Sequence, residues 1–237
     1  MLIEGTDGLV LIDCGLSRSS LENPGKLGFW NLLIGIKAGE RLAAVNQIQE
    51  LGFNPKDVRH IIPTHLDEDH AGGIIDFPNA TVHTSSVELE TLRNPPSWSE
   101  RFRYKLRAKS ENFNWCSYDF ADGEDWFGFA AVRELRGLPP EILLVPLAGH
   151  TRGHLGVAVQ SEGRWLFHVG DAYFNREELE RPNNFNVLLA HMFLDVDLKQ
   201  ARANRVRIKR LLREASNEIS VFCAHDPGEF EKLSARG

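Results

Sequence analysis

The segment of residues 64–73, Thr-His-Leu-Asp-Glu-Asp-His-Ala-Gly-Gly, is the feature that most constrains the fold of this chain. It follows an apolar run at 58–63 that is typical of a short buried strand. In extended backbone, His65 and Asp67 point the same way because side chains two apart share a face. Asp69 and His70 follow at a turn, and crowded carboxylates without a cation would repel one another. We therefore predict a bound metal here as the simpler account, with a solvated acidic turn as the alternative for the carboxylates taken alone.

Three later segments also end a predicted strand on a residue that can bind a metal. His150 lies in the glycine-flanked turn of residues 147–154, Asp171 follows the apolar run 165–169, and His225 follows the last apolar run, 219–223. Functional side chains commonly lie on loops that a rigid scaffold positions. The four segments together predict a metal site gathered along one edge of stacked sheets.

The order of the predicted elements indicates a mixed α/β fold. The turn at 5–8 predicts a hairpin leading into a strand at 9–13, and further strands are expected at 80–83 and 141–147. Apolar spacing and capping residues predict helices over 41–51, 86–93 and 198–214. Strands and helices alternate through both halves without a low-complexity linker, so we expect one domain over residues 1–237.

The stretch of residues 94–118 has a different pattern, in which basic and apolar residues alternate. Its period of two predicts a half-exposed strand or an extended loop with its charges in water. The alternative is a lid whose basic face attracts an anionic substrate. The basic residues of this pattern are Arg101, Arg103, Lys105, Arg107 and Lys109.

Composition narrows the class of partner. A formal net charge of -6 argues against nucleic acid, because phosphate binding requires a basic surface. No apolar run approaches the roughly 18 residues of a membrane helix, and no signal peptide is visible. The three cysteines, Cys14, Cys116 and Cys223, are far apart and form no CxxC motif. We therefore expect a cytoplasmic protein with a small-molecule substrate, bound neither to nucleic acid nor to a membrane; a homodimer is one option for its oligomeric state.

The ordered motifs resemble those of the metallo-β-lactamase superfamily. Its signature is T-H-x-H-x-D-H, a G-H-T-x-G-H turn, G-D and a late histidine, and the match extends from about residue 2 to residue 225. Residues 77–80 (Phe-Pro-Asn-Ala), the Ala-Gly-His-Thr turn and Gly-Asp-Ala at 170–172 are more similar to the lactonase and glyoxalase II branches. The resemblance implies a four-layer αββα sandwich, of α/β (α+β) class, and a hydrolase with two divalent metal ions, which we expect to be zinc.

The resemblance also implies roles for individual residues. His65, the residue at 67 and His150 would hold the first metal, while Asp69, His70 and His225 would hold the second and Asp171 would bridge the two. A hydroxide between the metals would attack a lactone, ester, thioester or similar carbonyl, with Asp69 orienting it. Tyr173 is a candidate donor to the substrate carbonyl, and its alternative is an aromatic side chain packed beside the strand.

Position 67 departs from the family pattern, because Asp67 stands where histidine is expected. A carboxylate can ligate zinc, but it favours harder metals such as iron or manganese. Two alternative functions follow: an iron-containing redox member that handles oxygen, nitric oxide or a persulfide, and a weakly active metal-binding relative.

Three residues near the motifs are given supporting roles. We expect His154 to support the turn that carries His150, and His168 to be a strand residue near the site. Cys223 is two residues before His225 and is expected to be a buried free thiol, with a thiolate metal ligand as the alternative.

Overall fold

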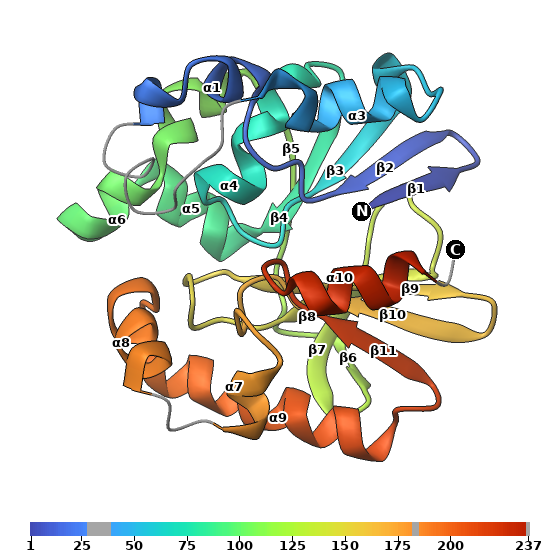
Figure 1. Cartoon of the computed structure of the whole chain (residues 1–237), viewed down its shortest axis with the longest axis vertical. Helices are drawn as coiled ribbons and strands as arrows, with labels where there is room; N and C mark the ends of the chain where they lie inside the picture. The colour runs from blue at the N-terminus through green and yellow to red at the C-terminus, as the bar shows by residue number, and fades with distance from the viewer. Residues whose placement is uncertain (28–38, 182–184, 236–237) are drawn as a thin grey trace. The chain divides into compact units, whose positions relative to one another are not determined.

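The computed structural model of the chain describes residues 1–27, 39–181 and 185–235. These residues form two compact units, each built on its own β-sheet (Figure 1). The first unit comprises residues 1–84 and 90–116, and the second comprises residues 85–89 and 117–237. Each unit combines strands with helices, in agreement with the predicted mixed α/β class. The expectation of a single domain over residues 1–237 stays a prediction.

The first unit contains a five-stranded sheet in the order β1-β2-β3-β4-β5. The predicted hairpin is confirmed: β1 and β2 are antiparallel, and Gly5 pairs with Gly8. β2, β3 and β4 run parallel. Such strands are buried on both faces, which explains the continuous apolar runs at 9–12 and 61–62. The strands are β1 (Leu2–Gly5), β2 (Gly8–Ile12), β3 (Val58–Ile62), β4 (Thr81–Ser85) and β5 (Asn114–Tyr118).

Several helices connect these strands, and two of the predicted ones are confirmed. α3 forms residues 44–50 of the helix predicted at 41–51, and a separate 3₁₀ turn, Glu40–Leu42, precedes it. Gly52 follows its C-cap Leu51, and the φ of +88° at Gly52 suits a residue without a Cβ. α5 has the predicted bounds. The helices are α1 (Arg18–Glu22), α3 (Ala44–Glu50), α4 (Glu68–Ala71), α5 (Ser86–Arg93) and α6 (Trp98–Arg103).

The second unit contains a six-stranded sheet in the order β11-β10-β9-β8-β7-β6. Its neighbouring strands are antiparallel except for β10 and β11, which are parallel. The strands are β6 (Glu124–Trp126), β7 (Phe129–Glu134), β8 (Ile142–Pro146), β9 (Leu155–Ser161), β10 (Arg164–His168) and β11 (Ile219–Phe222). The helices are α7 (Glu177–Glu180), α8 (Phe185–Leu194), α9 (Leu198–Glu214) and α10 (Pro227–Ser234).

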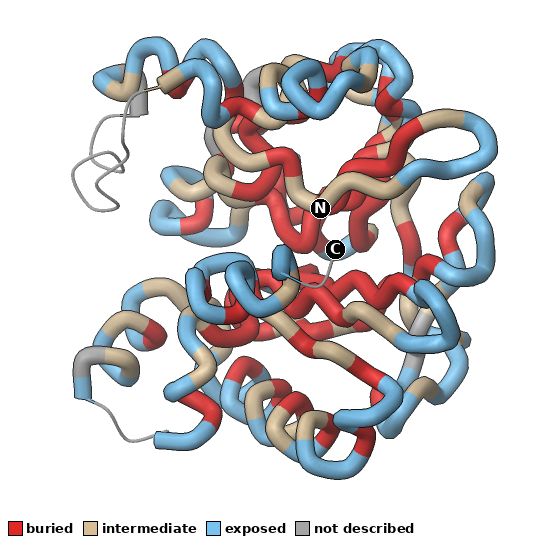
Figure 2. The backbone as a smooth tube through the Cα atoms, turned by 45° about the vertical axis from the view of Figure 1, so that its right-hand side comes forward, coloured by how far each residue is buried: buried red, intermediate tan, exposed pale blue. Residues whose placement is uncertain are grey.

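The core of the second unit lies between its sheet and α9. Ile208 and Leu211 of α9 belong to one buried cluster with Val145, Phe167 and Val221 of the strands, and the buried strands are visible in Figure 2. α9 begins as predicted at Asp197, whose side chain accepts from the backbone N–H groups of the first turn. Of the described helices, none is long and apolar enough to cross a membrane.

The prediction of a strand or extended loop over 94–118 is wrong for most of that stretch. α6 and a 3₁₀ segment, Lys105–Asn112, precede β5. Ser97 caps α6 by accepting from the backbone N–H of Glu100, and this S-x-x-E capping box outweighs the alternation of charges. Of the basic side chains in the pattern, those of Lys105, Arg107 and Lys109 lie outside the described residues.

Candidate metal centre

The first unit brings together the four residues predicted from the 64–73 segment. We call His65, Asp67, Asp69 and His70 the first ligand set. The chain leaves β3 and enters α4 here, with Asp67 at the N-cap position and in extended backbone. The Nε2 atom of His65 lies 3.2 Å from Asp67 Oδ2, and that of His70 lies 3.8 Å from Asp69 Oδ2. Both imidazoles are buried, and their ring centroids are 4.1 Å apart.

Both histidines of the first ligand set are oriented through their Nδ1 atoms. His70 Nδ1 donates to Asp13 Oδ2 at 3.0 Å, and His65 Nδ1 lies 3.1 Å from Thr64 Oγ1. The Thr64 hydroxyl also donates to Asp13 Oδ2, so it is free to accept from His65. A metal-binding histidine requires such a partner on its second nitrogen. Asp13 was not predicted, although an aspartate ending the strand at 9–13 was a usable signal.

Asp67 has a cationic partner that the sequence did not reveal. Arg103, at the end of α6, donates from Nε to Asp67 Oδ1 at 2.5 Å and from Nη2 to Oδ2 at 2.6 Å. The two side chains are only 13 % and 10 % exposed. Bidentate pairing of this kind is the strongest form of side-chain ion pair. The negative charge that Asp67 adds relative to histidine is therefore balanced within the first unit.

The second unit brings together the three remaining predicted ligands. We call His150, Asp171 and His225 the second ligand set. They follow β8, β10 and β11 respectively. Asp171 lies between the two histidines: its Oδ2 is 3.6 Å from His150 Nε2, and its Oδ1 is 3.3 Å from His225 Nε2. One carboxylate that directs its two oxygens at two histidines suits a bridging ligand.

A buried network of charged side chains supports His150 from behind. Asp195 Oδ1 lies 3.2 Å from His150 Nδ1, and its Oδ2 lies 3.0 Å from His191 Nδ1 and 3.2 Å from the Arg205 guanidinium. His191 Nε2 contacts Glu178 Oε2 at 2.9 Å. Burial alone would raise the pKa of Asp195, but its hydrogen bonds to the two histidines hold that pKa well below the ordinary value. Burial alone would lower the pKa of His191, but its carboxylate partners Asp195 and Glu178 raise that pKa above its ordinary value. The network was not predicted.

The expected supporting role of His154 is confirmed. Its Nε2 accepts from the backbone N–H of Asp171 at 3.0 Å, and its Nδ1 donates to the carbonyl of Leu147 at 3.2 Å. His168 is the last residue of β10, and its Nδ1 accepts from the backbone N–H of Gly170. These two histidines therefore fix the backbone that presents the Asp171 carboxylate.

The turn that carries His150 is held by a buried carboxylate. Glu88 Oε2 accepts from Thr151 Oγ1 at 2.8 Å and from the backbone N–H of Gly153 at 2.9 Å. A Cβ atom on Gly153 would lie 2.4 Å from the backbone nitrogen of Glu88, so only glycine allows this approach. The role of Glu88 could not be predicted from local spacing, because α5 and the turn are far apart along the chain.

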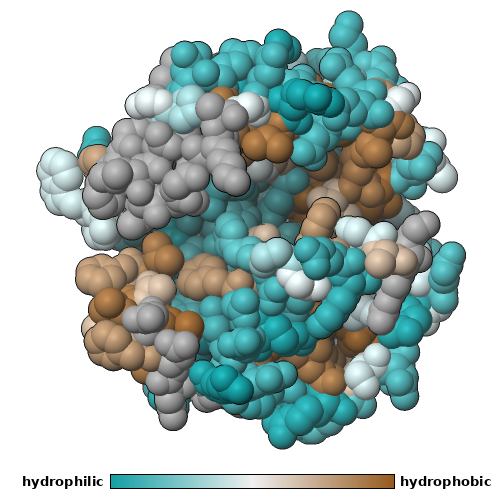
Figure 3. All heavy atoms as spheres, in the orientation of Figure 1, coloured by the Kyte–Doolittle hydropathy of each residue, from teal (hydrophilic) through white to brown (hydrophobic). Residues whose placement is uncertain are grey.

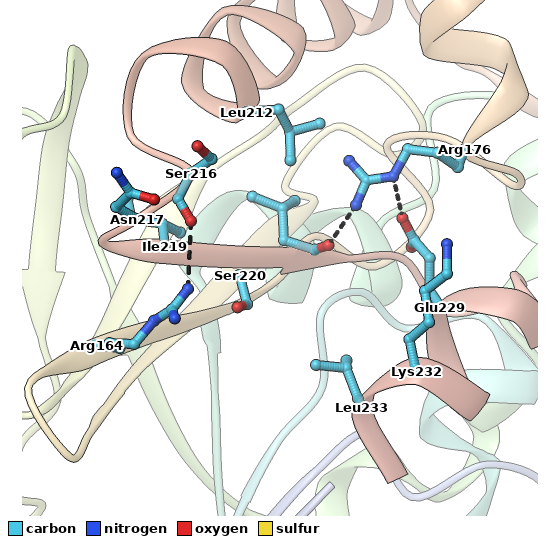
Figure 4. Close-up of a pocket in the computed structure, with 11 residues that line it drawn as sticks. Arg164, Arg176, Leu212, Ser216, Asn217, Ile219, Ser220, Glu229, Lys232 and Leu233 are labelled. Atoms are coloured by element: carbon cyan, nitrogen blue, oxygen red, sulfur yellow. Dashed lines mark hydrogen bonds and ion pairs between the residues drawn. The ribbon is translucent and has the colours of Figure 1, made fainter. Parts of the chain in front are cut away.

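Tyr173 has a structural position that does not support the predicted donation to a substrate. Its side chain is fully buried, and its hydroxyl donates to the Glu229 carboxylate at 3.0 Å. Burial and that carboxylate raise the pKa of the Tyr173 hydroxyl far above its ordinary value. Arg176 pairs with the same carboxylate (Figure 4). The position of Tyr173 therefore agrees better with the alternative, an aromatic side chain packed beside the strand.

Two other features near β11 are separate from the ligand sets. Cys223 is a buried free thiol as predicted, and burial raises its pKa, which disfavours a thiolate ligand. A surface pocket of about 410 Å³ opens between β11, α9 and α10, and its described lining includes Arg164, Arg176 and Lys232 (Figure 4). No member of either ligand set is among these lining residues.

The donor atoms fit divalent metal ions. His65, His70 and His150 each engage a neighbour through Nδ1 and direct Nε2 toward a carboxylate of their own ligand set. Imidazole nitrogens and carboxylate oxygens are ligands of zinc and of several other first-row metals. Like-charged carboxylates packed at the start of α4 also favour a cation.

Comparison with known proteins agrees with this chemistry. Residues 1–216 match the family described as "Metallo-beta-lactamase superfamily". A "probable metallo-hydrolase" of Mycobacterium tuberculosis is 36% identical over 98% of this chain and 75% of its own length. An N-acyl homoserine lactonase of a Bacillus species is 26% identical over 95% of this chain and 79% of its own length.

Solved structures show the same fold. An N-acyl homoserine lactone hydrolase, crystallised with the product N-hexanoyl-L-homoserine at its catalytic metal centre, superposes with a TM-score of 0.72. The superposition covers 98% of this chain and 82% of the other, with 22% sequence identity. The fold, the family match and the metallo-hydrolase relative agree with the motifs of the sequence. The chain therefore belongs to the metallo-β-lactamase superfamily and is a metal-dependent hydrolase.

Proposed function

We propose that this enzyme hydrolyses a lactone or a related ester or thioester with the aid of two divalent metal ions. The observation that carries the proposal is the shared orientation of His65, His70 and His150. Each has its Nδ1 atom engaged by a neighbouring side chain, and each directs Nε2 at a carboxylate 3.2 to 3.8 Å away. A histidine held only for packing has no need of this arrangement, whereas a metal ligand does.

The family correspondence supports a specific assignment of ligands. By that correspondence, His65, Asp67 and His150 would hold the first metal, and Asp69, His70 and His225 would hold the second. Asp171 would be a ligand of both. We propose zinc for both positions. Iron or manganese is the alternative that Asp67 supports, because a carboxylate favours harder ions.

The metals supply two chemical effects when bound: they lower the pKa of water toward about 7 and polarise the carbonyl under attack. The protein's own contribution is orientation. Asp13 and Asp195 hold His70 and His150 in place, and the backbone of Asp171 is fixed by His154. Asp69 is the carboxylate we assign to positioning the attacking water, since its side chain is the most exposed of the carboxylates in the first ligand set.

The substrate class rests on relatives. The Bacillus relative is named an N-acyl homoserine lactonase, and a small cyclic ester of that kind is the substrate class we propose. The described cysteines are free thiols, which suits the reducing cytoplasm.

The first test combines metal analysis with hydrolysis. Protein purified without added metal is expected to contain close to two zinc ions per chain, and to hydrolyse at least one member of a panel of lactones, esters and thioesters. Asp69→Ala should lower kcat at least about a hundredfold with little change in KM, because the lost group acts in the transition state. Iron in the purified protein together with an inactive panel would favour the redox alternative. Unchanged kcat in Asp69→Ala would contradict the assigned role.

A further inference from the structure

Helix α8 exposes an apolar stripe that the hydrolase chemistry does not use. Phe185, Leu188, Leu189 and Met192 follow the spacing of one helix face, and Phe193 lies beside them. We call these five residues the α8 patch. Their exposed fractions are 74, 45, 41, 65 and 81% in that order. Figure 3 shows apolar surface over α8, at lower left.

Away from this stripe, α8 carries the half-buried Val187, Ala190 and Leu194 and the buried His191. His191 is 2% exposed and is held between Glu178 and Asp195. The ring of Phe174 stacks on the imidazole, with centroids 4.8 Å apart. The helix cannot roll its apolar stripe inward without breaking these buried ion pairs, which would cost several kcal/mol. The α8 patch is therefore fixed in its outward orientation.

The size of the patch approaches that of one side of a stable interface. The exposed fractions amount to about three fully exposed large side chains, or roughly 600 Å². That is the upper end for the largest apolar patch of a monomeric protein, about 300–600 Å². A standard interface buries about 800 Å² per partner.

The charges around the patch favour a protein partner over a lipid surface. α8 contains no lysine or arginine, whereas helices that lie in a membrane interface are rich in both. Before it, the exposed Glu177, Glu180 and Arg181 carry two negative charges and one positive charge, and the chain has a net charge of -6. A convex apolar helix can pack against an identical helix, with ridges in grooves, across a two-fold axis.

We propose that the α8 patch is the interface of a homodimer in which α8 of one protomer packs against α8 of a second copy. The α8 patch forms the apolar centre of the contact. In a two-fold symmetric dimer the same patch is buried on both protomers. Met192 and Phe193 are the most exposed residues at its C-terminal end and are expected to contribute most to binding.

The test is the oligomeric state of the full chain, measured by sedimentation velocity and light scattering over a wide concentration range. The wild-type protein should be a dimer. The double variant Met192→Glu/Phe193→Glu should raise the dimer dissociation constant at least about 30-fold, which corresponds to the loss of one hot spot. Phe230→Glu is the matched control, because Phe230 is 70% exposed but lies on α10. Circular dichroism and metal content should be unchanged in all three proteins.

Three outcomes would overturn the proposal. The first is a wild-type protein that is monomeric at every concentration. The second is a dimer that the double variant does not weaken, or that Phe230→Glu weakens equally. The third is a monomer that co-sediments with phosphatidylcholine vesicles through Met192 and Phe193, which would assign the patch to a lipid surface.

Discussion

At the scale of single residues, the pair of Asp67 and Arg103 separates this enzyme from the histidine pattern of its family. Removing either partner leaves the other charge nearly buried, because the side chains are only 13 % and 10 % exposed. We predict that Asp67→His and Arg103→Met each lower the free energy of unfolding by about 3 kcal/mol. The double variant should lose less than the sum of the single variants, since it leaves no unpaired charge. Urea denaturation of the four proteins measures this coupling.

The zinc affinity of these variants is a second test of the Asp67–Arg103 pair. The double variant Asp67→His/Arg103→Met restores the histidine of the family pattern and leaves no unpaired arginine. It should therefore bind zinc at least about tenfold more tightly than wild type. Competition with a chromogenic chelator measures the affinity. Equal affinities in wild type and double variant would mean that residue 67 is not a ligand in this enzyme.

Asp195 permits a sharper test of how His150 is held. Asp195→Asn keeps the size of the side chain but removes the charge that fixes the Nδ1 proton of His150 and pairs with His191. We predict a loss of about 10- to 100-fold in metal affinity, the usual effect of removing such a partner. Asp197→Asn is the matched control, because asparagine also caps a helix and the Asp197 carboxylate accepts from the backbone of Lys199 and Gln200 at the start of α9. A similar loss in both variants would contradict the role of Asp195.

At the scale of elements, the sequence predicted those whose signals are local. α5 and α9 were predicted with their observed bounds, because a capping residue and an apolar stripe mark each of them. α6 was missed because the alternating charges were given more weight than the capping box at Ser97. α8 was missed because its apolar stripe faces solvent, so its hydrophobic pattern does not mark a buried face.

The turn around His150 depends on a close approach between elements. A Cβ on Gly153 would lie 2.2 Å from Ser85 Oγ and 2.4 Å from the backbone nitrogen of Glu88. We predict that Gly153→Ala lowers the free energy of unfolding by about 1 to 3 kcal/mol and weakens metal binding, because the turn must shift. Gly25→Ala is the control, since nothing lies within 4 Å of a Cβ there. Urea denaturation and metal titration of both variants are the measurements.

At the scale of the whole molecule, the order of the motifs predicted the family and the fold, because ligand residues recur at strand ends. The seven predicted metal ligands fall into two sets, and each set is brought together within its own unit. The supporting residues Asp13, Glu88, Arg103 and Asp195 could not be predicted in the same way. They act on residues 36 to 65 positions away in the sequence, and no local spacing marks such partners.

Acid stability is a property of the whole chain to which one buried histidine pair contributes. His83 on β4 is 1% exposed, and its Nε2 atom lies 2.9 Å from His60 Nδ1 on β3. Burial, together with the nearby His60, lowers the pKa of His83 to about 3. The unfolded chain binds a proton at this residue below its ordinary pKa of about 6.5, while the folded chain does not. The stability contributed by neutral His83 is therefore present above about pH 6.5 and is lost as the pH falls toward 3.

We predict that this residue alone lowers the free energy of unfolding by about 2 kcal/mol between about pH 7 and pH 5. His83→Asn removes the titrating group and should flatten the pH dependence by that amount, whatever its effect on stability at neutral pH. The comparison requires urea denaturation of wild type and variant at matched pH values in the presence of a chelator, so that loss of metal does not contribute. Parallel curves for the two proteins would show that His83 is protonated equally in the folded and unfolded states, and that the acid sensitivity arises elsewhere.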